Sequence, residues 1–431
     1  MSKQYFKLKE GMKLGVASAA TQIEGGDIRH SWMDWYLQGH IQDGSTPARA
    51  NQHYRLWRED AALMKEMGIE IYRLGVEWAR IEPQQGAYDE AVIRHYKEEI
   101  KLLLEYGIQP LVTLHHFTNP IWFEEKGGFE KKENIRYFLR FVKKMVVAFG
   151  SKVNEYITLN EPNVYATLGY YEGQWPPGKK SMLQATKVMS VMAAAHIQAY
   201  TLIHKCRKKM GYTDTKVGFA NHMRVFIPEN SKDLRHCFFA KITEYFFQGS
   251  LCAAMYTGKF FWPVRNVMNL PRGRYSDFLG LNYYTRSAVK NLGDNVRKGV
   301  AVNDLNWEIY PKGIVECAKK LYQYLPLPIY ITENGTCDKD DRFRSRYLYE
   351  HIREISETKL PVERYYHWCF CDNFEWIEGE SARFGIVHVD YETQQRTIKE
   401  SGEFFMALRK ENGVDKMLYD KYVKDKKYTF N

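Results

Sequence analysis

The sequence of 431 residues contains no run of eighteen apolar residues, the length that a helix needs to cross a bilayer. We therefore predict no membrane partner. Its first residues, MSKQYFKLKEG, lack the apolar core of a secretory signal peptide. The seven cysteines form no CxxC pair, and their odd number favours free thiols in a reducing compartment. These absences lead us to expect a cytoplasmic protein.

Metal-binding and nucleic-acid-binding patterns are also missing. Cys369 and Cys371, in the sequence CFC, would point to opposite faces of a strand and would make a poor metal pair. The formal charge is +10, but the basic residues are mixed with acids, as in KKENIR, and form no single stripe. We predict no metal site and no nucleic-acid partner, and the sequence leaves the oligomeric state open.

Aromatic residues are abundant, with 31 Tyr, 23 Phe and 10 Trp making up 15% of the chain. The hydrophobic fraction of 45% is ordinary for a globular protein. This composition indicates much flat surface, available either for packing or for contact with a ring-shaped ligand.

Short stretches of apolar and β-branched residues alternate eight times with longer amphipathic segments. The longer segments include 89–106, 133–150 and 181–211, and the first two end at a glycine suited to follow a helix. Strands that are apolar on both faces and alternate with helices are typical of a covered parallel sheet. The predicted strands are 12–19, 69–77, 108–116, 153–161, 216–223, 277–284, 328–335 and 364–370.

Eight such units without a Pro/Gly/Ser-rich linker predict an α/β fold, a single (β/α)₈ TIM barrel over residues 1–431. Its active site is expected at the C-terminal ends of the strands. A doubly wound open sheet is the alternative, but no GxGxxG follows the first predicted strand.

Two carboxylic acids end predicted strands of this barrel, Glu161 in ITLNEP and Glu333 in YITENG. Because the C-terminal strand ends meet at one mouth, we expect the two groups to converge. Cleavage of a glycosidic bond uses one protonated and one ionised carboxyl group. A separation of about 5–5.5 Å would make the ionised group a nucleophile and retain configuration, whereas a wider gap would leave room for water and invert it.

The other strand ends carry groups that suit a sugar, because amides, imidazoles and carboxylates bind hydroxyl groups and indoles stack on a pyranose face. These residues are Gln22, Glu24, Arg73, His115, His116, Asn282, Tyr284, Trp368, Glu375 and Trp376.

The motifs TLNEP, ITENG and DNFEW, in this order, resemble those of glycoside hydrolase family one, the β-glucosidase family of retaining enzymes. The resemblance extends from ATQIEG at 20–25 to RFGIVHVD at 383–390. It implies hydrolysis of terminal non-reducing β-D-glucosyl residues from β-glycosides or short β-linked oligosaccharides. Galactosyl and fucosyl residues are plausible further substrates. No cofactor is implied.

The resemblance also assigns roles. Glu161 matches the general acid/base and Glu333 the nucleophile. Arg73 and Tyr284 match groups beside the nucleophile, completed by Asn282, and Asn160 matches the partner of the sugar 2-hydroxyl. The remaining matches are hydroxyl-binding positions (Gln22, His116, Glu375 and Trp376), the indole floor under the sugar (Trp368) and a position on the leaving-group side (Trp307).

Each assignment has a simpler structural alternative. A single strand-end glutamate is often a helix cap or an ion-pair partner, and Arg73 could pair with Glu77. Of the two adjacent histidines, we expect His115 to be a packed barrel residue and His116 to contact the sugar. Trp307 and Trp175 could be packed aromatic residues. Cys337, just after ITENG, is expected to be inert, although a thiol reagent could reach it if it faces the mouth.

The sequence also allows comparison with three rival functions: a phospho-glycosidase, a non-catalytic binding barrel and a transglycosylase. Relatives acting on 6-phosphorylated sugars replace the DNFEW acid, whereas Glu375 is present here, with Ala382 and Phe384 in place of the phosphate-binding Lys and Tyr. A non-catalytic binding barrel is disfavoured because both Glu161 and Glu333 are present. Transglycosylation is open if water access is poor. Thr118 and Asn119 depart from the family pattern, and we expect them to alter the entrance.

Overall fold

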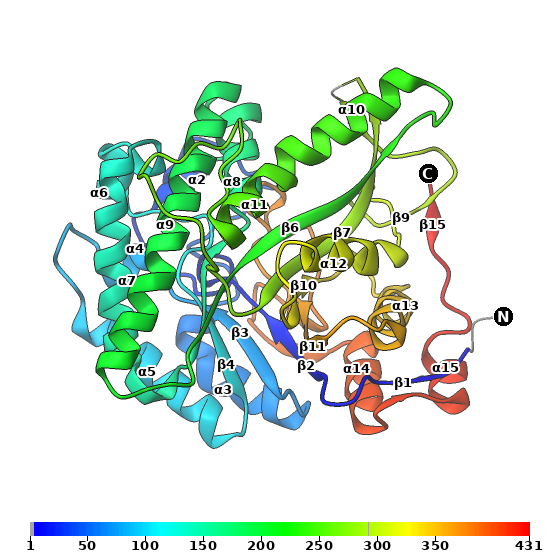
Figure 1. Ribbon diagram of the computed structural model, residues 1–431. Helices are drawn as coiled ribbons and strands as arrows, with labels where there is room; N and C mark the ends of the chain where they lie inside the picture. Colours follow the sequence, from blue (N-terminus) through cyan, green and yellow to red (C-terminus); the bar gives the residue numbers. More distant parts are fainter. Residues whose placement is uncertain (1–3, 292) are drawn as a thin grey trace.

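Eight parallel strands form a closed barrel, as the alternating sequence pattern predicts (Figure 1). The computed structural model describes residues 4–291 and 293–431. The strands pair in the order β10–β11–β2–β3–β4–β5–β6–β7, and the pairing of β7 with β10 closes the barrel. Their bounds are β2 (Lys13–Ala17), β3 (Ile71–Gly75), β4 (Gln109–Thr113), β5 (Glu155–Asn160), β6 (Lys216–Pro228), β7 (Leu279–Lys290), β10 (Ile329–Asn334) and β11 (Val362–Trp368).

Helices follow every barrel strand and cover the outside of the barrel. The predicted helices 89–106, 133–150 and 181–211 correspond to α5, α7 and α9. The main helices are α3 (His53–Glu66), α5 (Glu90–Glu105), α7 (Ile135–Phe149), α9 (Met182–Lys209), α10 (Leu234–Glu244), α11 (Ser250–Thr257), α12 (Lys312–Tyr322), α13 (Arg344–Glu357) and α14 (Glu400–Lys410). Shorter ones are α1 (Ala20–Ile23), α2 (Ser31–Leu37), α4 (Trp78–Ile81), α6 (Ile121–Glu125), α8 (Pro162–Ala166) and α15 (Lys416–Tyr422).

Helix α5 illustrates how the sequence sets its own boundaries. The Asp89 carboxylate accepts hydrogen bonds from the backbone N–H groups of Ala91 and Val92, which have no partner within the first helical turn. Gly107 follows the last turn at a φ of +77°, a conformation that glycine adopts without a steric penalty.

The interior of the barrel is filled by residues that alternate along the strands. On β3, Ile71 joins the cluster inside the barrel while Tyr72 and Leu74 pack toward the helices, so Arg73 must also point inward. At the amino-terminal end, Arg364 donates to Glu155, with 2.6 Å between Nη2 and Oε1. This packed end leaves the C-terminal mouth for chemistry.

Strands β6 and β7 run farther than the predicted ranges 216–223 and 277–284. Beyond the barrel they continue to pair with each other, from Val225 opposite Arg286 to Pro228 opposite Val289. Figure 1 shows this extension leading toward α10, and β8 (Gly293–Asn295) adds an antiparallel strand to it. The added length is stabilised because Phe226 and Val289 pack against Ala240 of α10.

The described residues also form three two-stranded sheets: β1 (Phe6–Lys7) with β14 (Gly413–Val414), β12 (Val387–Val389) with β13 (Arg396–Ile398), and β9 (Ala301–Val302) with β15 (Thr429–Phe430). Across residues 4–291 and 293–431, no helix combines the length and apolar character needed to cross a bilayer. The interpretation of residues 1–431 as one domain stays a prediction.

Candidate active site

Strand β5 ends at Asn160, and Glu161 stands at the mouth in a left-handed backbone conformation with a φ of +40°. Its N–H group donates the last strand hydrogen bond to the carbonyl of Ala220 at 2.8 Å. Pro162 then begins α8, where its missing N–H group costs nothing because the first helical residues have no intrahelical acceptor. The sequence Asn-Glu-Pro therefore ends a strand, turns the chain and starts a helix within three residues.

The carboxyl group of Glu161 is buried and receives hydrogen bonds on one oxygen. Asn282 Nδ2 donates to Oε1 at 2.8 Å, and His222 Nδ1 lies 3.1 Å from the same atom. Burial raises the pKa of Glu161, but His222, the hydrogen bond from Asn282 and the charge of Arg73 hold it below its usual value. Burial lowers the pKa of His222, so this ring is neutral near pH 7. It then lowers the pKa of Glu161 through its hydrogen bond and not through a charge.

Glu333 lies at the end of β10, opposite Asn282 and next to a shift in strand register. Arg73 Nη1 lies 2.5 Å from its Oε1, and Tyr284 Oη donates to its Oε2 at 2.6 Å. Arg73 thus pairs with Glu333 and not with Glu77. The Glu77 carboxylate instead accepts from the Ala79 N–H group and a neighbouring threonine hydroxyl.

The two carboxyl groups belong to one hydrogen-bond network. Asn160 Oδ1 accepts from Arg73 Nη2 at 2.7 Å and from Asn282 Nδ2 at 3.1 Å. Arg73 also donates to Glu333, through Nη1, and Asn282 Nδ2 also donates to Glu161. Burial and then the charge of Glu161 raise the pKa of Glu333 to about 7, against the lowering effect of Arg73. The pair therefore retains one proton near neutral pH.

Indole and imidazole rings line the adjacent wall. The His116 ring stacks between Trp368 and Trp376, with centroids 5.8 and 5.9 Å away and an interplanar angle of 23° to each. Trp368 Nε1 donates to Glu375 Oε2 at 3.3 Å. Gln22 Nε2 donates at 2.9 Å to the carbonyl of Phe374, the residue before Glu375. The predicted hydroxyl-binding residues are therefore close together.

Two buried polar atoms in this wall have no hydrogen-bond partner among the described residues, Gln22 Oε1 and His116 Nδ1. His116 Nε2 accepts from Asn160 Nδ2 at 3.0 Å, so Nδ1 carries the ring proton. Burial and then Arg73 hold the pKa of His116 well below its usual value, which keeps the ring neutral. One free acceptor and one free donor can thus be satisfied by ligand hydroxyl groups.

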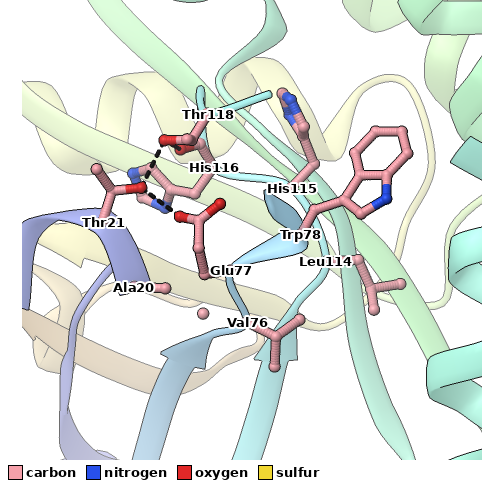
Figure 2. Close-up of a pocket in the computed structure, with 10 residues that line it drawn as sticks. Ala20, Thr21, Val76, Glu77, Trp78, Leu114, His115, His116 and Thr118 are labelled. Atoms are coloured by element: carbon pink, nitrogen blue, oxygen red, sulfur yellow. Dashed lines mark hydrogen bonds between the residues drawn. The ribbon is translucent and has the colours of Figure 1, made fainter. Parts of the chain in front are cut away.

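His116 is one of the residues that line a cavity of about 10 Å³, the volume that one water molecule requires (Figure 2). Thr21, Glu77 and Thr118 line it, and Thr21 Oγ1 lies 2.6 Å from Thr118 Oγ1. The prediction that Thr118 and Asn119 shape the entrance is wrong, because both side chains are buried. Asn119 Oδ1 instead lies 2.9 Å from Nε2 of His115, which is a packed barrel residue as expected.

Trp307, Trp175 and Cys337, for which the sequence allowed either a packing role or contact with the mouth, have different surroundings. Trp307 is half-buried and packs against Tyr284, with 5.9 Å between ring centroids. Trp175 is buried against Trp376 at 5.6 Å, so it supports the indole wall from behind. Cys337 is buried, and burial raises its pKa to about 12, which agrees with an inert thiol.

Sequence reasoning missed three residues that contact this network. His222 approaches Glu161, Thr332 Oγ1 donates to Asn282 Oδ1 at 2.6 Å, and Thr113 Oγ1 accepts from Arg73 Nε at 3.0 Å. His222 could have been found, because it lies in the predicted strand 216–223 near its C-terminal end. The two threonines carry no comparable signal.

The closed (β/α)₈ barrel and the paired carboxyl groups at its mouth are the features of a carbohydrate-cleaving TIM barrel. The model of glycosyl hydrolase family 1 matches residues 4–414. Beta-glucosidase A of Thermotoga maritima is 32% identical, over 95% of this chain and 99% of that protein. A beta-galactosidase of Pyrococcus woesei is 26% identical, over 95% and 98%.

Solved structures agree. A beta-glycosidase from Pyrococcus horikoshii has a TM-score of 0.87 and 32% identity, covering 97% of this chain and 98% of that one. The beta-glucosidase from Thermotoga maritima in complex with glucoimidazole has a TM-score of 0.87 and 31% identity, covering 95% and 100%. The chain belongs to glycosyl hydrolase family 1, and it is a glycoside hydrolase.

Proposed function

We propose that this protein is a retaining β-glycosidase that releases terminal non-reducing β-D-glucosyl residues from β-glycosides or short β-linked oligosaccharides. The observation that carries the proposal is the contact of Arg73 and Tyr284 with one carboxyl group, Glu333, in the same network as Glu161. The relatives named beta-glucosidase support glucose as the sugar. The proposal takes residues 1–431 as one cytoplasmic catalytic domain.

In the first step, a Glu333 carboxylate oxygen attacks the anomeric carbon. The bond from this carbon to the glycosidic oxygen breaks, its electron pair moves to the oxygen, and Glu161 gives that oxygen a proton. Arg73 and Tyr284 hold the attacking carboxylate ionised and oriented. A covalent glycosyl-enzyme and a free alcohol result.

The proton of the pair belongs on Glu161 before the reaction. Glu333 receives the positive charge of Arg73 directly, whereas Glu161 receives hydrogen bonds from the uncharged groups of Asn282 and His222. A charged donor stabilises a carboxylate more than neutral donors do. The ionised and protonated roles thus follow from the different neighbours of the two acids.

In the second step, ionised Glu161 takes a proton from a water molecule, whose oxygen attacks the anomeric carbon and releases the Glu333 carboxylate. Two inversions give net retention. The protein needs no cofactor for either step, because the two side chains supply the nucleophile, the acid and the base.

Sugar recognition is assigned to the wall of the mouth. Gln22 and Glu375 would bind the 4-hydroxyl region, and His116 and Trp376 would bind neighbouring hydroxyl groups. Trp368 would form the floor under the sugar ring. Carboxylate and amide groups can reach an axial or an equatorial hydroxyl, so galactosides and fucosides are included as further substrates. Asn160 would bind the 2-hydroxyl, and Trp307 would lie toward the leaving group.

The test compares the parent with Glu333→Ala and Glu161→Gln on aryl β-glucosides, galactosides and fucosides. Following the anomeric proton by NMR should show β-glucose first, and an initially inverted product would refute retention. Adding azide should restore turnover, with α-glycosyl azide from Glu333→Ala and β-glycosyl azide from Glu161→Gln. No hydrolysis above background by the parent or by either variant would indicate a non-catalytic barrel. Oligosaccharide as the main product would indicate a transglycosylase.

A further inference from the structure

His222 is the residue of strand β6 that contacts Glu161, and its ring lies beside the reactive site. Nδ1 lies 3.1 Å from Glu161 Oε1, and the ring stacks on Tyr284 with centroids 5.8 Å apart and 16° between the planes. Phe247 packs perpendicular to the ring, with 5.9 Å between the ring centroids. These contacts fix the plane of the imidazole ring. The position of the ring proton therefore decides whether Nδ1 donates a hydrogen bond to Glu161 Oε1 or accepts one.

Arg224 determines that proton position. Its Nε–H group, which can only donate, points to His222 Nε2 at 2.9 Å. Nε2 must therefore accept, and the single proton of the neutral ring lies on Nδ1, facing Glu161. Arg224 is held in turn by Asp294 Oδ2, 2.7 Å from its Nη1, and by two backbone hydrogen bonds with the buried side chain of Gln248.

Oε1 of Glu161 consequently accepts from two N–H groups, one from His222 and one from Asn282. The orientation of the Asn282 amide is also fixed, because its Oδ1 accepts from the Thr332 hydroxyl at 2.6 Å. An oxygen that faces two donors cannot also carry a proton without breaking one of these bonds. The acidic proton must then be on the other oxygen, Oε2.

We propose that His222 and Arg224 are positioning residues for the acid/base step: together they direct the transferable proton of Glu161 to Oε2 and hold Oε1 as a pure acceptor. This inference rests on the proposed function, since it assigns roles around the same general acid. Once the proton has moved to the leaving oxygen, the same two N–H bonds stabilise the carboxylate that must act as base.

The charged and titratable groups around this unit are few. Glu161 and Arg224 face His222 directly, with Asp294 behind Arg224. Glu172 lies near Arg224 and Asp294, and burial raises its pKa. Around Glu161 itself the other charged groups are Arg73 and Glu333, whereas the hydroxyl of Tyr284 is directed to Glu333.

The kinetic test uses His222→Phe, which keeps a flat ring but has no N–H group, and aryl β-glucosides with leaving groups of different acidity. A 2,4-dinitrophenyl group departs without a proton, whereas a phenyl group needs one. We expect kcat/KM to fall about tenfold on the phenyl glucoside and less than about twofold on the dinitrophenyl glucoside. An equal fall on both would indicate a structural role and overturn the proposal.

The alkaline limb of the kcat/KM profile, which reports loss of the Glu161 proton, should also move. Removing an N–H donor from the carboxylate raises the pKa of Glu161, so the limb moves to higher pH by about one unit. His222→Asn, which keeps an N–H donor, should restore part of both effects. An unchanged limb in His222→Phe would contradict the inference.

Arg224→Met removes the group that fixes the ring proton, and Arg235→Met, on α10, is its matched control because Arg235 is exposed and pairs only with Asp233 in the described chain. The Arg224 variant should lower kcat/KM selectively on the phenyl glucoside, and the Arg235 variant should match the parent. Equal activity of both variants and the parent would overturn the role of Arg224.

The ring proton itself is read by two-bond ¹H–¹⁵N correlation NMR of the ¹⁵N-histidine-labelled parent, with the His222 signals identified by their loss in His222→Asn. We expect the Nδ1–H tautomer in the parent and a mixture in Arg224→Met, and an Nε2–H tautomer in the parent would refute the inference. This measurement needs no turnover. It decides the inference even if His222→Phe does not fold, and inactivity of the parent on every glycoside would count against the proposed function alone.

Discussion

Arg73 Nη1 and Glu333 Oε1 lie 2.5 Å apart in the interior of the barrel, and both side chains are almost fully buried. The guanidinium group also donates to the Thr332 carbonyl and to the Thr113 hydroxyl, each at 3.0 Å, and to Asn160. A charge held by four acceptors is fixed in position and cannot relax toward solvent. The attacking carboxylate is thus oriented before any sugar binds.

Arg73→Lys should reduce kcat/KM by at least about a hundredfold, because a single ammonium group cannot replace the four directed hydrogen bonds of the buried guanidinium. The measurement is hydrolysis of an aryl β-glucoside, with thermal unfolding recorded to show that the variant folds. A folded variant with parental kcat/KM would contradict the assigned support of Glu333.

Tyr284→Phe should shift the acid limb of the kcat/KM profile to higher pH. The phenol lowers the pKa of Glu333 by donating to Oε2, so its loss raises that pKa, and the carboxylate becomes ionised only at higher pH. One hydrogen bond to a charged acceptor corresponds to a shift of about one unit. A limb that stays in place while kcat falls would show that the hydroxyl acts only on orientation.

A buried ion cluster outside the site should govern the pH dependence of stability. His53 Nδ1 lies 2.7 Å from Asp60 Oδ2, and Nε2 lies 2.9 Å from Glu99 Oε1. Burial lowers the pKa of His53, but Glu99 and Asp60 raise it more, to about 10. Its folded-state pKa therefore exceeds the unfolded value of about 6.5. The stabilisation is complete below the unfolded value and is lost as the pH rises toward 10.

The free energy of unfolding, measured in urea from pH 6 to pH 10, should accordingly fall more steeply for the parent than for His53→Leu. The variant should also be less stable by about 3 kcal/mol at pH 7, because Glu99 is left buried beside an apolar side chain. Parallel curves for the two proteins would show that His53 is neutral in the folded state.

Thiol reagents should leave activity intact. Five of the seven free cysteines are buried, Cys337 among them, and only Cys206 and Cys237 are partly accessible. Burial raises the pKa of Cys337 to about 12, so almost no thiolate is present at pH 8. We expect about two thiols to react in the folded protein and seven in urea. Inactivation in step with a third reacting thiol would place Cys337 within reach of the mouth.

Plain aryl β-glucosides should be hydrolysed much faster than their 6-phosphates. The carboxyl group of Glu375 lies beside Trp368, where it would repel a phosphate. Ala382 and Phe384 are both buried and have no side-chain donor for a phosphate. Glu375→Ser should narrow the difference between the two substrates. Faster cleavage of the phosphorylated glucoside by the parent would show that the protein prefers 6-phosphorylated sugars and would contradict this prediction.

The sequence predicts the barrel well because strand and helix periods are local properties. Six of the eight strands agree with their predicted ranges to within about three residues at both ends, whereas β6 and β7 run farther. Glu161 and Glu333 follow from strand ends that carry an acid. The inner support of the site was not predicted in the same way. Thr113 and Thr332 are ordinary β-branched strand residues, and only their contacts with Arg73 and Asn282 give them a role.

Two further features depended on tertiary contacts. The continuation of β6 and β7 beyond the barrel requires their mutual pairing and the packing of α10, neither of which local periodicity records. His222 could have been found from its place near a strand end, but Arg224, which donates to it, lies beyond the predicted strand 216–223. Thr118 and Asn119 were expected to alter the entrance because they depart from the family pattern, but both are buried and Asn119 contacts His115 and Tyr165.

The partners of Arg224 have a consequence for how the protein responds to its medium. Asp294 retains 42% of its side-chain exposure and Arg224 28%, while the ring they hold is buried. Dissolved ions can reach this outer pair and weaken it. Because the site residues themselves are buried, turnover should vary with ionic strength through this outer pair, even for an uncharged glucoside.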